Sequence, residues 1–151
     1  MAPQLHYLTV QDILWINFQV TDKVQQFNFA LLEEATYYQY GYGEGRSLAP
    51  QAARFLAGFP KLHPIDAGNE ATIFVACLTF LKLNGMSIDL PDGKGAEWFQ
   101  SVQTKQVDAQ TAIKSIAKPS HGHHDAPSIR KTVKDLIGEY PRTLQALAEP
   151  A

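Results

Sequence analysis

The residues best suited to chemistry stand between His63 and Asn69, where the chain reads His-Pro-Ile-Asp-Ala-Gly-Asn. Histidine changes its charge near neutral pH, so His63 can accept a proton from a hydroxyl group. Asn is a favoured N-cap, and Gly68 lets a ligand approach the backbone closely. The free N–H groups of a first helical turn attract anions such as phosphate. The stretch therefore indicates either a phosphate site or, more simply, a capped helix that follows a surface loop.

The segment that must position these residues is uncharged over positions 72–81. A helix that is apolar on every side is buried on every side. This run is too long for a strand and too short to span a membrane, and the Asn-Gly at 84–85 is a typical C-terminal stop. The pattern predicts a central buried helix over residues 69–84, with Cys77 inside it as an inert hydrophobic side chain.

The same stretch resembles the signature of the Fic/Doc (filamentation and death-on-curing) family, which runs His-Pro-Phe-x-Asp/Glu-Gly-Asn-Gly/Lys-Arg. His63, Pro64, Gly68 and Asn69 match that order, and Ile65 keeps the apolar position of the phenylalanine. The resemblance is specific only around residues 52–86, so it implies more about the site than about the rest of the chain.

A weaker resemblance extends over residues 6–118. Residues 80–85 are similar to the end of the family's motif helix, and residues 7–13 are similar to its first helix. The resemblance implies an all-α bundle around a buried central helix, with at most a small β element. We expect residues 1–118 to form this domain, and the linker and helical tail at 119–151 to pack on it.

Family members transfer AMP, or in the death-on-curing branch a phosphate, from a nucleotide to a hydroxyl group of another protein. The resemblance implies a toxin-like transferase that uses ATP and Mg²⁺, a protein target with a Ser, Thr or Tyr hydroxyl, and an antitoxin partner. His63 matches the base. The N–H groups at Gly68, Asn69 and Glu70 match the phosphate site. Asp66 is the carboxylate that remains for the metal ion.

Two positions depart from the family pattern, and each weakens the site. The family's acidic metal ligand is Ala67 here, and its phosphate-binding arginine is Ala71. Glu70 adds a negative charge beside the phosphate site, where like charges at ~4 Å repel by on the order of 1 kcal/mol in water. Two hypotheses follow: an attenuated transferase in which Lys61 or Arg54 supplies the missing cation, and a catalytically inactive Fic-fold protein that binds a partner or a small ligand.

A glycine-rich loop that includes Gly41, Tyr42 and Gly43 precedes the motif. It lacks both the preceding strand and the Gly-Lys-Ser/Thr sequence of a P-loop, so a P-loop is rejected. In the family, a flap near this part of the chain aligns the target protein. The resemblance therefore implies that role for these three residues.

The composition of the 151-residue chain is ordinary for one globular domain. The net charge of −2 gives no electrostatic support for nucleic-acid binding. A single cysteine cannot form an internal disulfide, and the N-terminus lacks the basic and apolar stretches of a secretion signal. We expect a cytoplasmic protein that binds neither nucleic acid nor membrane.

Helical spacing recurs along the rest of the chain. Thr9 and Asp12 form a capping box before a helix that ends near Thr21, and its buried stripe is apolar except for Asn17. The histidines at 120–125 are interpreted as part of an exposed linker rather than a metal site. Other elements expected are helices over 27–40, from Ser47 to Gly58-Pro60, over 96–103, from Asp108 to Pro119 and over 127–147 with a break at Pro141, and a short edge strand at 88–90.

Overall fold

A computed structural model of the protein describes residues 5–41, 47–120 and 128–148. Within these residues the fold is all-α, with eight helices and one two-stranded antiparallel sheet. In chain order the elements are α1 (Val10–Thr21), α2 (Phe29–Tyr37), α3 (Leu48–Leu62), α4 (Asn69–Leu83), β1 (Met86–Ile88), α5 (Asp92–Gln103), α6 (Ala109–Ile116), β2 (Ala117–Pro119), α7 (Ile129–Glu139) and α8 (Pro141–Leu147).

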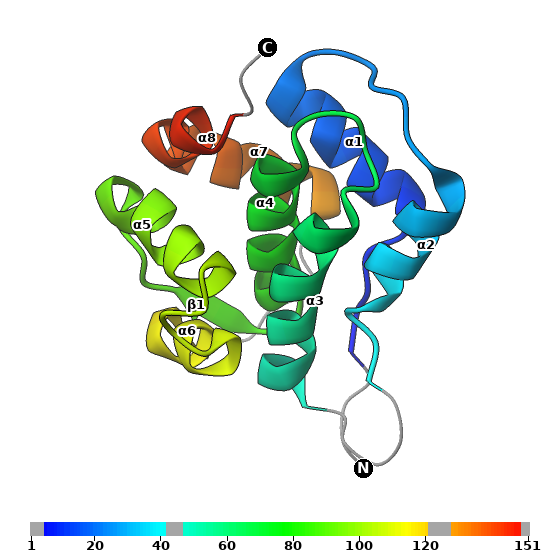
Figure 1. Cartoon of the computed structure of the whole chain (residues 1–151). Coiled ribbons are helices and arrows are strands. Elements are labelled where there is room, and N and C mark those ends of the chain that lie inside the picture. The colour runs from blue at the N-terminus through cyan, green and yellow to red at the C-terminus, as the bar shows by residue number, and fades with distance from the viewer. Residues whose placement is uncertain (1–4, 42–46, 121–127, 149–151) are drawn as a thin grey trace.

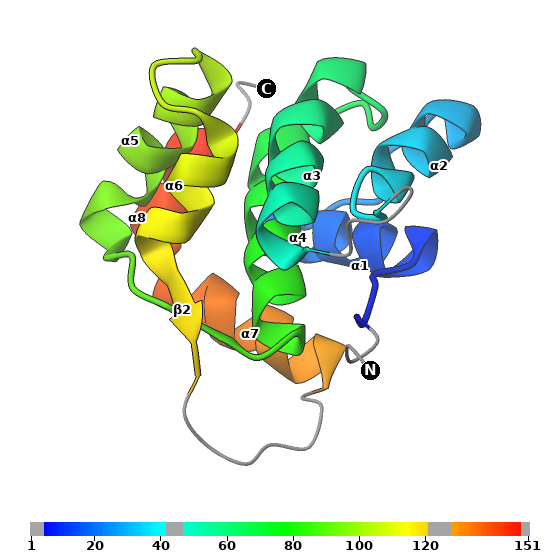
Figure 2. The ribbon, with the colours of Figure 1, turned by 90° about the horizontal axis from the view of Figure 1, so that it is seen from below.

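Helix α4 lies at the centre of the molecule, as the uncharged sequence predicted. All residues at 71–81 are buried, and α1, α3 and α7 pack directly against this helix. Figure 1 shows α1 and α2 on one side of α4, and α5, α6 and α8 on the other. Figure 2 shows that α3 and α7 flank α4 on opposite sides. The helix is therefore enclosed from all directions, which explains why it has no polar face.

Phe74 joins α4 to the C-terminal half of the chain. Its ring meets those of Trp98, Phe99 and Tyr140 at steep angles, with centroids 6.2, 6.3 and 5.2 Å away. Edge-to-face pairs of this kind contribute about 0.5–1.5 kcal/mol each beyond the area that they bury. The aromatic cluster thus fixes α5 and the α7–α8 junction against the central helix.

Two further contacts attach the C-terminal helices to the body. The hydroxyl group of the buried Tyr140 donates a hydrogen bond to the carbonyl oxygen of Leu90 at 2.7 Å. The carboxylate of Asp92 accepts hydrogen bonds from the backbone N–H groups of Arg142 and Thr143 at 3.0 and 2.9 Å. Both contacts lie at the N-terminal turn of α8. They hold this helix in place, and α8 packs along α5.

The small β element joins residues that are distant in sequence. Ser87 of β1 stands opposite Lys118 of β2 in an antiparallel register. The expectation that a helix continues to Pro119 is wrong: α6 ends at Ile116, and the carbonyl oxygen of Ile116 accepts a hydrogen bond from the backbone N–H group of Asp89 at 2.6 Å. A partner strand outside the helix is thus what ends α6.

Helix α3 is longer than the sequence indicated, since it passes through Gly58 and Pro60 and ends at Leu62. A proline inside a helix leaves the carbonyl group four residues earlier without its donor. Here that carbonyl belongs to Leu56, and it accepts a hydrogen bond from the side-chain amide of Gln103 at 3.2 Å. A residue of α5 therefore replaces the missing donor, and the helix continues to the motif.

Two other boundaries also differ from the expectation. Helix α2 begins at Phe29 rather than at Phe27, because the side chain of Asn28 caps it by accepting a hydrogen bond from the N–H group of Leu31 at 3.0 Å. Helix α5 begins at Asp92, directly after Pro91, four positions before the expected start. In both cases a residue just before the helix, Asn28 or Pro91, sets where the helix begins, rather than the first apolar residue of its periodic pattern.

Among the described residues, no helix has the length and apolar character needed to cross a bilayer.

Candidate functional site

His63 lies at the exposed end of α3. It is the C-cap of that helix and adopts a left-handed conformation with φ of 45°, while its N–H group donates to the carbonyl oxygen of Pro60 at 3.1 Å. Histidine is one of the few residue types enriched in this conformation. The cap turns the chain sharply out of α3, so the motif loop starts at the histidine itself.

Asn69 organises the motif loop, but not as the expected N-cap. Gly68 is the N-cap of α4, with φ of 79°, and Asn69 is the first helical residue. The Asn69 side chain folds back over the loop, where Oδ1 accepts from the N–H group of Ile65 at 3.1 Å and Nδ2 donates to the carbonyl oxygen of Ile65 at 2.6 Å. The buried Asn69 amide therefore closes the loop into a fixed turn.

The same amide determines which ring nitrogen of a neutral His63 carries the proton. Both contacts with Ile65 set the orientation of the Asn69 amide, so the nitrogen that lies 3.3 Å from His63 Nδ1 is Nδ2. An amide nitrogen can only donate, and Nδ1 must therefore accept. The proton of the neutral ring then lies on Nε2, which makes Nε2 a donor.

Helix α1 holds the other half of the loop through Asn17. This buried side chain donates from Nδ2 to the carbonyl oxygen of Ala67 at 2.9 Å and to the hydroxyl oxygen of Thr72 at 3.1 Å. The resemblance did not assign a role to Asn17. The signal was present in the sequence as the one polar residue on the buried stripe of that helix, because a buried amide needs partners.

Gly68 cannot be replaced without moving α1. A Cβ atom at this position would lie 2.4 Å from the Thr21 methyl carbon Cγ2 and 3.0 Å from Asn17 Nδ2. The positive φ is a second constraint, since L-residues rarely adopt it. The N-terminus of α4 is thus covered by α1 at Gly68, which is itself buried.

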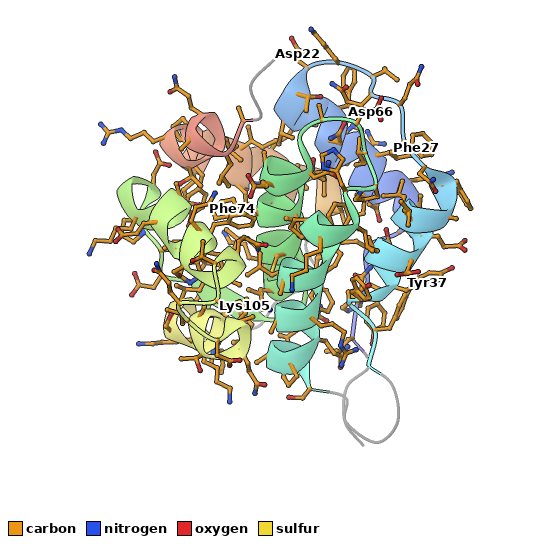
Figure 3. The ribbon with its side chains drawn as sticks, viewed as in Figure 1. Asp22, Phe27, Tyr37, Asp66, Phe74 and Lys105 are labelled. Carbon is orange, nitrogen blue, oxygen red and sulfur yellow. The ribbon has the colours of Figure 1, made fainter. Side chains whose placement is uncertain are left out.

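Residues 26–28 cover the other side of the motif loop. Phe27 and Ile65 form an isolated antiparallel bridge, with hydrogen bonds from Asn28 N–H to Pro64 and from Asp66 N–H to Gln26, both at 2.9 Å. Figure 3 shows Phe27 and Asp66 at the same end of the molecule, near the loop between α3 and α4. The segment that was expected to begin α2 instead supports the site.

The structure gives little support to the residues expected to bind the metal ion and the phosphate. Asp66 is exposed, and no group of three His, Cys, Asp or Glu side chains that could hold a metal ion is found in the described part of the chain. Ala71 is 4% exposed, so a long basic side chain at this position would have to displace core neighbours. Glu70 is half-buried in the first turn of α4.

The two candidate replacement cations lie elsewhere. Arg54 donates from Nη1 to the carbonyl oxygen of Tyr40 at 2.8 Å, which commits it to the chain before α3. Lys61 lines a groove between α3 and the α5–α6 connection. Of the expected flap, Gly41 is half-buried, whereas Tyr42 and Gly43 lie outside the described residues, as does the histidine cluster.

Comparisons of the chain with protein-family models, with curated proteins and with solved structures found no significant match.

Proposed function

We propose that this protein is an attenuated Fic/Doc-like transferase, which moves a phosphoryl or AMP group from ATP to a hydroxyl group of a protein target in the cytoplasm. The observation that carries the proposal is the contact between His63 and Asn69. It holds a titratable ring beside the first turn of α4, whose N–H groups and dipole favour a phosphate. Two of the motif residues that match the family, His63 and Asn69, are thus in direct contact.

The transfer forms a bond from the target's hydroxyl oxygen to phosphorus and breaks the bond from that phosphorus to the leaving group, which is pyrophosphate in AMP transfer and ADP in phosphoryl transfer. The hydroxyl proton passes to His63, and the N–H groups at Gly68–Glu70 hold the charge that develops on the phosphate oxygens. Mg²⁺ is normally held by one or two carboxylates together with substrate phosphates, and Asp66 is the residue that would hold it. When bound, that ion would neutralise the polyphosphate.

The contact between His63 and Asn69 also supports the proposal that the activity is attenuated. His63 accepts a proton at Nε2 only when its own proton lies on Nδ1, and Nδ1 would then face the N–H₂ group of Asn69. Loss of such a half-buried hydrogen bond costs about 0.5–1.5 kcal/mol. A barrier raised by that amount lowers a rate by roughly 2- to 10-fold. This penalty adds to the absence of a basic side chain at Ala71.

The experiment that tests the transferase uses purified protein, magnesium and a cell extract, with ATP labelled either in the α- or in the γ-phosphate. Label transferred from the α-position identifies AMP transfer, and label transferred only from the γ-position identifies phosphoryl transfer. The labelled protein band should disappear with His63→Ala. It should persist with His6→Ala, because the side chain of His6 is exposed and only its backbone is hydrogen-bonded, to Asn84.

A second candidate function is a Fic-fold protein that binds a partner, such as an antitoxin, or a small ligand without transferring a group. The observation that favours it is the donor character of His63 Nε2, because a donor recognises an acceptor but does not deprotonate a hydroxyl group. No label in any extract protein, together with binding of ATP that weakens in His63→Ala, would select this candidate and exclude the first.

A further inference from the structure

A groove separate from the motif loop lies between α3 and the connection from α5 to α6. Its volume is about 400 Å³, within the range of small-ligand sites. Figure 3 shows Lys105, which belongs to this connection, on the opposite side of α3 from Tyr37. The residues that line the groove are Ala57, Lys61, Val102, Gln103, Lys105, Val107, Asp108 and Ala109.

The groove has a fixed shape because its two walls are joined. Gln103 spans from α5 to the carbonyl oxygen of Leu56 on α3, the carbonyl that Pro60 leaves without a donor. The α5–α6 connection is closed by two hydrogen bonds, from the N–H groups of Gln106 and Val107 to the carbonyl oxygen of Ser101 at 2.9 and 3.1 Å. A small molecule that enters this groove therefore meets a preformed surface.

The walls of the groove combine polar and apolar side chains, and the apolar part consists of Ala57, Val102, Val107 and Ala109. Val102 is 4% exposed and belongs to the core, whereas Val107 is 36% exposed although it is a large hydrophobic residue. Ala57 and Ala109 add short side chains that leave room between the helices. These residues suit the flat or short apolar body of a ligand, since burying apolar surface is favourable by roughly 25 cal/mol per Å².

Two positively charged side chains line the groove. Lys61 and Lys105 are exposed, and neither makes an ion pair or a side-chain hydrogen bond with any described residue. The carboxylate of Asp108 is already engaged, because it accepts from the N–H and hydroxyl groups of Thr111 at 3.2 and 3.3 Å and caps α6. The groove therefore offers two ammonium groups against one capped carboxylate.

We propose that this groove binds a small organic phosphate whose body is apolar, such as an aromatic or short alkyl phosphate monoester. A phosphate monoester carries up to two negative charges near neutral pH, which matches Lys61 and Lys105, and lysine binds phosphate as a point charge. The apolar body fills the space over Val102 and Val107. His63 does not line this groove, so binding there can be tested independently of the transferase activity.

Phenyl phosphate is the probe, titrated into the ¹⁵N-labelled chain of 151 residues at constant ionic strength, with backbone amide shifts as the readout. The largest shifts should occur at residues 102–109 and 57–61, with a dissociation constant of roughly 1 mM, typical of a fragment of this size. Inorganic phosphate should bind at least about fivefold more weakly because it has no apolar body. Benzyl alcohol, which has no charge, should bind more weakly still.

Charge-removing variants test whether the two lysines hold the anion. Lys61→Gln and Lys105→Gln should each weaken phenyl phosphate binding by about fivefold or more, whereas Lys94→Gln, an equivalent change at an exposed lysine near the start of α5, should leave it unchanged. Each spectrum also reports whether the variant is folded. Equal affinity in all three variants, or shifts confined to residues 63–71, would overturn the proposal.

Discussion

At the scale of single residues, Gly68 shows how tightly the motif loop is built. Its φ of 79° and the 2.4 Å that would separate an added Cβ atom from Thr21 Cγ2 are two separate obstacles to any side chain. Gly85 has a similar φ of 88°, but a Cβ there would meet nothing within 4 Å. Replacing Gly85 by alanine therefore measures the cost of the backbone conformation alone, whereas replacing Gly68 by alanine adds the cost of the steric clash.

We expect Gly68→Ala to lower the free energy of unfolding by roughly 2–4 kcal/mol, and Gly85→Ala by about 1 kcal/mol. Urea unfolding followed by circular dichroism measures both. Thr21→Ser removes the clashing methyl group but keeps the hydroxyl group that donates to Asn17 at 2.8 Å. Combined with Gly68→Ala, it should restore about 1 kcal/mol or more. Equal losses at both glycines would show that α1 does not press on Gly68.

The second prediction concerns the proton of His63. At about pH 8.5, where an ordinary imidazole is neutral, two-bond ¹H–¹⁵N spectra should show this ring protonated on Nε2. Asn69→Asp replaces the donor beside Nδ1 by a carboxylate oxygen, and the proton should then move to Nδ1. His6, an exposed histidine, serves as the internal reference. An Nδ1–H ring in the unmodified protein would contradict the assigned network and would strengthen the case for a base.

At the scale of elements, the neighbouring helices bury α4, and the reactivity of Cys77 measures how completely they exclude solvent from it. The thiol is 0% exposed, and its burial raises the pKa far above the ordinary value. A reagent needs both access and a thiolate. We expect a thiol-specific reagent to modify Cys77 quickly in denaturant and only at the rate of global opening in the native protein. Rapid labelling of the native protein would show that α4 opens on its own.

The junction of α7 and α8 carries a pH-dependent contact. Burial, with smaller contributions from Glu139, Asp92 and Asp89, raises the pKa of Tyr140 to about 12 from 10.0. The phenol is protonated more strongly in the folded chain than in the unfolded chain. Its contribution to stability is therefore complete below pH 10 and is lost as the pH rises toward about 12.

Tyr140→Phe tests this contact. At pH 7 the variant should unfold with about 0.5–1.5 kcal/mol less free energy, because the hydrogen bond to the Leu90 carbonyl is lost. The difference in unfolding free energy between the variant and the unmodified protein should decrease between pH 10 and about 12, because the buried hydroxyl group opposes deprotonation and so destabilises the unmodified protein at high pH. Tyr37→Phe, at a ring that is 43% exposed, provides the control and should show no such decrease. A difference independent of pH would argue against a raised pKa.

At the scale of the whole molecule, the C-terminal helices complete the core rather than form an appendage. α7 packs on α4, and Phe74 of α4 meets Tyr140 at a centroid distance of 5.2 Å. A chain that ends at residue 127 would expose this face of the central helix. Losing a buried aromatic ring alone typically costs about 3–5 kcal/mol, a large fraction of the stability of a domain.

We therefore expect the chain that ends at residue 127 to lose its cooperative unfolding transition in calorimetry and its dispersed amide spectrum. Arg130→Ala is the matched control, because it removes only the exposed guanidinium group that lies 4.7 Å from the Trp15 ring centre. That change should cost less than about 1 kcal/mol. A truncated chain that still unfolds cooperatively would mean that α7 and α8 are dispensable for the core.

The sequence by itself determined the central helix, the capping box at Thr9, the break at Pro141 and the burial of Cys77. Each of these depends on neighbours along the chain: an uncharged run, a side chain that reaches the next turn, or a proline ring. The motif residues could also be found in this way, because their order is local. The two boundaries at Phe29 and Asp92 were missed although their signals are local as well.

Only the tertiary structure decided the rest, because it depends on groups that are distant in sequence. Gln103 lets α3 continue past Pro60, Asn17 holds the carbonyl group of Ala67 from 50 residues away, and β2 ends α6 by pairing with β1. The role of Asn69 likewise differs from the expected N-cap. Gly68 takes the N-cap position with a left-handed conformation, and the Asn69 side chain instead binds the backbone of Ile65. Hydrogen-bond partners of this kind satisfy buried polar groups wherever the fold brings them, and no spacing along the chain records them.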